Sequence, residues 1–129
     1  MRNEKKSITN FSNKDKSKMD FKDYDFDKGM FYGTNFSNSN LEGVNLRGAN
    51  LKHSLLINTN LRNANLTGAN LQSANLSGAD LTGAILKSCN LKSADFIDAI
   101  LTDAVFQDTN IKKAKNLVFD SEINMKQDG

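Results

Sequence analysis

The chain has 129 residues, 38% of them hydrophobic, and a formal net charge of +2. This length suits one domain, and no apolar run approaches the ~20 residues that span a bilayer, so we expect no membrane span. The chain has one cysteine, so we predict no internal disulfide. Its basic N-terminal residues are followed by no apolar stretch, so we predict no secretory signal. Both features favour the cytoplasm.

Residues 1–18 differ in composition from the rest of the chain. They carry six basic and two acidic groups and are rich in Lys, Ser and Asn. Such a composition is typical of a flexible tail, which we predict here, with a short capping helix anchored by Phe11 as the alternative. The tail accounts for the positive net charge, because residues 19–129 carry a net charge of −2.

A five-residue repeat follows. From Phe21 to Ile111, every fifth residue is Phe, Leu or Ile. Every fifth residue from Gly29 to Ala114 is small, and up to Thr109 it stands two places before an apolar residue. The residue before each apolar residue is Asn or Asp at 14 of 19 sites. The unit therefore reads A-N-L-x-x, as in Ala64-Asn65-Leu66-Thr67-Gly68.

A period of five fits neither the 3.6-residue turn of a helix nor the two-residue alternation of a strand. A chain that turns a corner every five residues lets every small residue and every Leu or Phe point inward. Four such sides close one turn, so residues twenty apart stack. Asn, Asp and the recurrent Gly of the last position suit the tight turns between sides. The absence of proline agrees with stacked coils joined by backbone hydrogen bonds.

On these residues the chain resembles the pentapeptide-repeat family, whose motif A-[DN]-L-x-x is matched across 19–115. The resemblance implies an all-β fold, a right-handed quadrilateral β-helix of nearly five coils. The first turn of the expected coil holds four phenylalanines, which we expect to form an aromatic plug: Phe21, Phe26, Phe31 and Phe36. The register breaks at Asn116, so we predict a C-terminal cap over 116–129 with a frayed end.

Two groups of outward residues are candidate interaction sites, and the alternative for both is an ordinary solvated surface. One is a basic face without acidic groups, which an acidic partner would fit. The other group is apolar and lies on two opposite faces. Such residues are typical of a protein or dimer interface, unless the C-terminal cap or the N-terminal tail covers them. The basic face holds Lys52, His53, Lys92, Lys112 and Lys113, and the apolar patch holds Leu55, Ile57, Ile97, Ile85 and Val105.

The sequence predicts no catalytic, metal or cofactor site. His53 is the only histidine, and Cys89 stands at an inward small position, so we expect no zinc site. The neighbouring acidic residues Asp25 and Asp27, like Asp95 and Asp98, lie on outer walls without a pocket, which disfavours acid–base catalysis.

The favoured function is therefore a non-catalytic bacterial scaffold for protein–protein interaction. We expect an unidentified protein partner or a homodimer, no small-molecule substrate and no nucleic acid. Two alternatives stay open. Some proteins of the family mimic DNA and bind topoisomerases such as gyrase, but that needs dense negative charge, and the most acidic face here has five acidic groups opposed by Lys22 and Arg62. The other alternative is a secreted effector addressed by residues 1–18.

Overall fold

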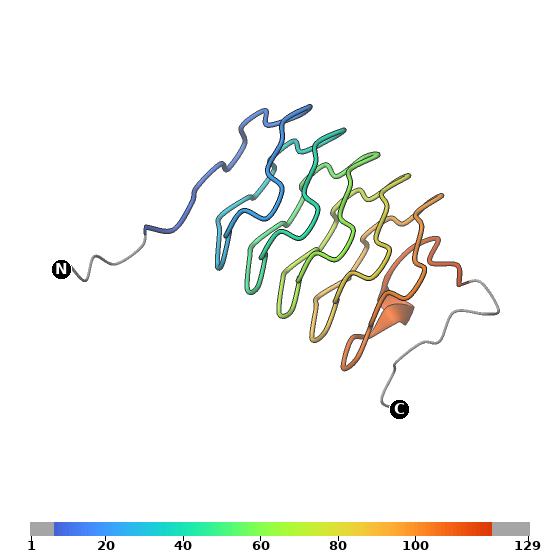
Figure 1. Cartoon of the computed structure of the whole chain (residues 1–129). Helices are drawn as coiled ribbons and strands as arrows, with labels where there is room; N and C mark the ends of the chain where they lie inside the picture. Colours follow the sequence, from blue (N-terminus) through green and yellow to red (C-terminus); the bar gives the residue numbers. More distant parts are fainter. Residues whose placement is uncertain (1–6, 120–129) are drawn as a thin grey trace.

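The computed structural model describes residues 7–119, and over this range the chain winds into a four-sided coil. Parallel bridges join residues twenty apart, from Asn10↔Met30 to Asp95↔Lys115. Each turn therefore takes twenty residues, five to a side. The coils stack in chain order from the blue end to the orange end (Figure 1).

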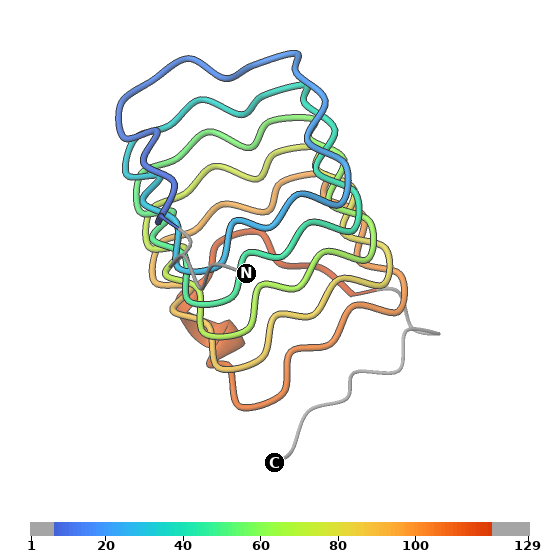
Figure 2. The ribbon, with the colours of Figure 1, turned by 60° about the vertical axis from the view of Figure 1, so that its left-hand side comes forward.

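Backbone hydrogen bonds between coils hold the stack together. Around Leu61, the amides of Leu61 and Asn63 donate to the carbonyls of Asp80 and Thr82 in the next coil, at 2.8 and 2.9 Å. The amide of Ala64 then donates to the carbonyl of Leu61 at 3.1 Å and closes a turn at the corner. Because a turn interrupts every side, the described coils pair through isolated bridges rather than long strands. Figure 2 shows the same bends repeated from coil to coil.

We call the four stacked faces walls and number the five positions of the repeat in the order A-N-L-x-x. The first and third positions point inward, the second points out of the middle of a wall, and the fourth and fifth form the edge that leads to the next wall. The third positions are Phe21, Leu41, Leu61, Leu81 and Leu101 in wall 1; Phe26, Leu46, Leu66, Leu86 and Phe106 in wall 2; Phe11, Phe31, Leu51, Leu71 and Leu91 in wall 3; and Phe36, Leu56, Leu76 and Phe96 in wall 4.

The place of Asn and Asp differs from the prediction. Positive φ falls on the fifth position of the repeat, for example 59° at Asn63 and 73° at Gly68, so the left-handed residue of each corner is not the second-position Asn or Asp. That residue anchors the turn from the wall instead: Oδ1 of Asn60 accepts a hydrogen bond from the amide of Arg62 at 3.0 Å. The expected corner role of the fifth-position glycines is confirmed, because all six have positive φ.

The interior is a column of apolar side chains. The central leucines from Leu41 to Leu86 are 0% exposed. The predicted aromatic plug is present at the N-terminal end, where neighbouring rings such as Phe26 and Phe31 lie 5.1 Å apart. Phe11 adds a fifth ring, 5.8 Å from both Phe26 and Phe31.

The coil begins earlier than predicted, so the tail assignment of residues 1–18 is wrong for residues 7–18. Asn10 and Asp15 form bridges with Met30 and Asn35. The alternative of a helix near Phe11 is also wrong, because Phe11 occupies a third position. Sequence reasoning missed this coil because Lys16 stands at the next third position. At the end of a stack the aliphatic part of a lysine can cover apolar surface, and the Lys16 ammonium lies 4.4 Å from the centre of the Phe11 ring.

The C-terminal end leaves the repeat at the 3-10 helix η1 (Ile111–Lys113), the one helix in the described range. The Asn110 side chain caps it by accepting from the Lys112 amide at 3.1 Å. Leu117 and Phe119 then pack, partly buried, against the core, and the Phe119 ring lies 5.4 Å from that of Phe106. The rest of the predicted cap, residues 120–129, lies outside the described residues.

Buried hydroxyl groups at the first position of the repeat differ in whether they make a hydrogen bond. Thr59 Oγ1 donates to the Phe36 carbonyl at 2.9 Å, whereas the buried Ser54 hydroxyl has no partner. We therefore expect Ser54→Ala to raise the free energy of unfolding by about 1 kcal/mol and Thr59→Ala to lower it by a similar amount. Urea unfolding measures both, and equal losses in the two variants would contradict this reading.

Candidate functional site

The predicted basic residues lie on one edge of the rod rather than across a face. Lys52, His53 and Lys92 are fourth- or fifth-position residues of wall 3, and Lys112 and Lys113 lie in η1, which continues this wall. Together they line the edge between walls 3 and 4, which we call the basic edge. Lys52 is half-buried and the other four are exposed. Wall 3 and this edge contain no acidic residue in the described range. Tyr32 lies at the N-terminal side of the edge, with its ring 5.3 Å from that of His53.

The predicted apolar residues do not form one continuous patch. Ile85 and Val105 are bridged neighbours on wall 2. Leu55 lies on wall 4 between Asn35 and Asn75, with Ile57 at the adjoining edge. Ile97 stands at the same edge but two coils further along, because Ser77 occupies the coil between. The exposed fractions are 38% for Leu55, 36% for Ile85 and 46% for Ile97.

Two further exposed apolar side chains also depart from the Asn or Asp of the second position. Ile100 and Met30 are 48% and 47% exposed. The sequence signal that finds them is the one that finds Leu55 and Ile85, namely an apolar residue at a wall position. Tyr24 and Met19, which are 53% and 45% exposed near the N-terminal end, carry no such signal because they stand at first positions that the coil normally buries.

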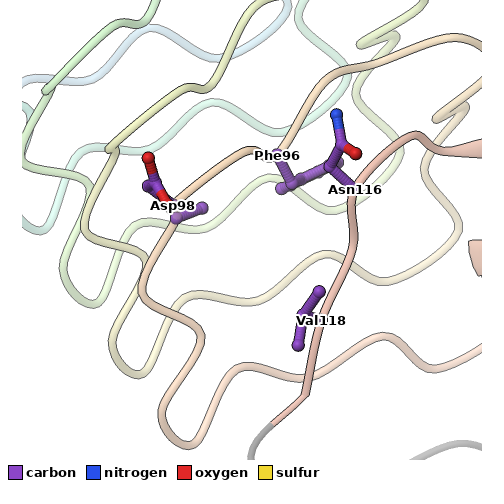
Figure 3. Close-up of a pocket in the computed structure, with 5 residues that line it drawn as sticks. Phe96, Asp98, Asn116 and Val118 are labelled. Atoms are coloured by element: carbon purple, nitrogen blue, oxygen red, sulfur yellow. The ribbon is translucent and has the colours of Figure 1, made fainter.

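A surface hollow of about 380 Å³ lies beside the C-terminal segment. Its lining residues are Phe96, Asp98, Ala99, Asn116 and Val118. Figure 3 shows Asn116 and Val118 on the C-terminal segment, with Asp98 on the neighbouring coil. The Asn116 amide group donates to Asp95 Oδ1 at 2.8 Å. Among these lining residues Asp98 is the one ionisable group, so they provide no acid–base pair.

The most acidic face is wall 1 with the edge toward wall 2, and it is partly neutralised. It carries Asp20, Asp23, Glu42, Asp80 and Asp103. Arg62 lies 3.1 Å from the Asp80 carboxylate. Partial burial acts to raise the pKa of Asp80, but hydrogen bonds from Thr82 and Arg62, together with the Arg62 charge, outweigh it and lower the pKa from its ordinary value. Asp80 is therefore held as a paired anion.

The residues with reactive chemistry serve the fold. Burial raises the pKa of the Cys89 thiol to about 12, and Sγ donates to the Leu66 carbonyl at 3.0 Å. Asp25 and Asp95 accept hydrogen bonds from the amides of Asp27 and Ile97, as turn anchors do. Within residues 7–119, no three His, Cys, Asp or Glu side chains gather as a metal site would require. In the same range no helix has the length and apolar character to cross a membrane.

The repeat geometry is matched by a known family. The family model for pentapeptide repeats matches eight copies over residues 45–83 and 84–115, more than half of the chain. The chain belongs to the pentapeptide-repeat family. No curated protein matches it in sequence.

Solved structures support the same fold. A pentapeptide repeat protein from the thylakoid lumen of Arabidopsis thaliana is 28% identical with a TM-score of 0.53, and the match covers 81% of this chain and 69% of that one. A pentapeptide repeat protein from the cyanobacterium Cyanothece 51142 is 29% identical with a TM-score of 0.43, covering 75% and 63%. The expected right-handed quadrilateral β-helix is therefore confirmed.

A third similar structure is QnrB1, a plasmid-mediated fluoroquinolone resistance protein. It is 19% identical with a TM-score of 0.40, and the match covers 82% of this chain and 64% of that one. A likeness this distant carries no inference about gyrase.

Proposed function

We propose that the protein is a non-catalytic scaffold that binds a protein partner on its walls. The observation that carries the proposal is the replacement of Asn or Asp by exposed apolar residues at wall positions. A second-position Asn contributes a turn-anchoring hydrogen bond, as Asn65 does to the Thr67 amide at 3.0 Å. Ile85 and Val105 cannot supply that bond; Ile85 is 36% exposed and Val105 is half-buried, so both present apolar surface in its place. Apolar side chains that reach the surface side by side are typical of interfaces.

Wall 2 is the best supported of the apolar surfaces. Ile85 and Val105 lie on adjacent coils and are joined by a parallel bridge, so their side chains stand next to each other. Leu55 and Ile97, by contrast, lie two coils apart on wall 4. A homodimer that pairs wall 2 of two copies is one form that this interface can take.

The test of wall 2 as an interface puts back the asparagine that the repeat normally has at the second position. In the variant Ile85→Asn/Val105→Asn, the two asparagines are expected to anchor their turns as Asn65 does, so the fold is kept while the apolar surface is removed. We expect affinity capture from native lysate to lose a partner that the unaltered chain retains, or sedimentation to show loss of a dimer. Leu55→Asn is the matched control on wall 4. If the double variant keeps both partner and oligomeric state, wall 2 is not the interface.

Neither alternative gains a specific observation. The acidic face would need dense unpaired charge to imitate DNA, and one of its five carboxylates is paired with Arg62. Residues 7–18, part of the segment that would address an effector, belong to the first coil instead. A cytoplasmic location, favoured by a single buried cysteine, stays a prediction.

A further inference from the structure

Wall 3 and its basic edge together form an array of hydrogen-bond donors. Asn50, Asn70 and Asn90 stand at successive second positions of this wall, and Asn110, the N-cap of η1, follows at the same spacing. In each of them Oδ1 accepts the amide hydrogen of the residue two places on, at 3.0–3.1 Å. Because the oxygen is held by the backbone, each side chain turns its NH₂ group, a pure donor, away from that turn.

The lysines add positive charge along the same line. Lys92 is a fourth-position residue of wall 3, and Lys112 and Lys113 lie in η1, which follows twenty residues later. The Ser93 amide donates to the Lys113 carbonyl at 2.9 Å, so η1 lies directly beside the coil that carries Lys92. Neighbouring coils lie ~4.8 Å apart, so these ammonium groups repel one another in the free protein. An anion bound along the edge would relieve that repulsion.

The surroundings limit the width of the ligand. The edge between walls 2 and 3 carries Asp27 and Asp108, and wall 4 carries Asp15 and Asp95. A broad polyanion such as a nucleic-acid duplex would overhang wall 3 and meet these carboxylates, whereas an extended peptide would fit within the wall.

We propose that wall 3 and the basic edge bind an extended acidic segment of a partner protein. The segment runs along the stack, with its carboxylates on the lysines and on the asparagine NH₂ groups. This inference rests on the proposed scaffold function, and it names the chemistry of the partner and a surface other than wall 2.

The test uses a labelled peptide of about ten glutamates, with an oligothymidine of similar charge as the competing ligand. Fluorescence anisotropy on the full chain is expected to show binding to the peptide that weakens as salt rises from about 0.05 to about 0.3 M. Lys92→Glu/Lys112→Glu should weaken binding about tenfold or more. Lys22→Glu/Lys87→Glu, which makes the same change of net charge on other edges, should weaken it by no more than about twofold.

A second pair of variants tests the asparagine donors. Asn70→Asp keeps an oxygen for the Gln72 amide but removes the NH₂ group, and Asn65→Asp makes the same change on wall 2. We expect Asn70→Asp alone to weaken peptide binding, with both variants keeping the thermal stability of the parent to within a few degrees.

Three results would overturn the proposal: no peptide binding at low salt, equal loss in the two charge-reversal variants, or tighter binding of oligothymidine than of the peptide. None of them bears on wall 2, because the Ile85→Asn/Val105→Asn experiment leaves wall 3 intact. The two proposals therefore fail separately.

Discussion

Replacing Leu66 by alanine is expected to lower the free energy of unfolding by about 2–5 kcal/mol. Leu66 is 0% exposed and lies in the middle of the stack, between Leu46 and Leu86 of the same wall. The hydrogen bonds of the Leu66 and Gly68 amides to the next coil, 2.7 and 2.8 Å long, fix the spacing of the coils around it. The walls therefore cannot close on the cavity, and the cost should approach the upper part of that range.

The position along the rod supplies the control. Leu101, which is 3% exposed, lies in the last complete side of wall 1 and stacks on Leu81 on one side only within the repeat. Because each coil of a solenoid is stabilised by its neighbours, Leu101→Ala should cost clearly less than Leu66→Ala. Urea unfolding at 25 °C measures both variants. If Leu101→Ala costs as much as Leu66→Ala, the coils do not act through their neighbours alone.

The fold was predictable from the sequence because the repeat encodes inward and outward positions directly. The apolar third position and the small first position identify the core, and the fifth-position glycines identify the corners. Prediction failed where backbone bonding continues without those side chains. At Lys16 the coil continues because the hydrogen bonds between coils are made by the backbone: the Lys16 amide donates to the Asn35 carbonyl at 2.7 Å.

The surface was harder to predict, since a one-dimensional repeat does not distinguish a wall from an edge. The twenty-residue spacing groups the basic residues in the sequence, but their place on an edge depends on where the turn falls. The donor array of wall 3 was missed for a related reason. Asn70 looks like a turn residue in sequence, and its free NH₂ group becomes evident once Oδ1 is seen to accept from the Gln72 amide at 3.0 Å.

Gly29→Ala is expected to lower the free energy of unfolding by about 1–3 kcal/mol, because the aromatic plug leaves no room for a side chain at position 29. Gly29 is a buried first-position residue, and a Cβ there would overlap the Phe31 ring and lie 3.0 Å from the Phe26 carbonyl oxygen. One coil later, Ala49 fills the same position opposite Leu51 without difficulty, and both are at most 1% exposed. The cause of the strain is therefore the size of Phe31.

This cause makes a double-mutant test decisive. Phe31→Leu alone should also destabilise the protein, because the plug loses ring contacts such as the one to Phe36 at 5.3 Å. The double variant Gly29→Ala/Phe31→Leu recreates the Ala49 and Leu51 pair of the next coil, so it should be more stable than the sum of the single effects by about 1 kcal/mol or more. Urea unfolding of the four proteins gives this coupling energy. Single effects that add to within about 0.5 kcal/mol would show that Gly29 is set by something other than the ring that packs on it.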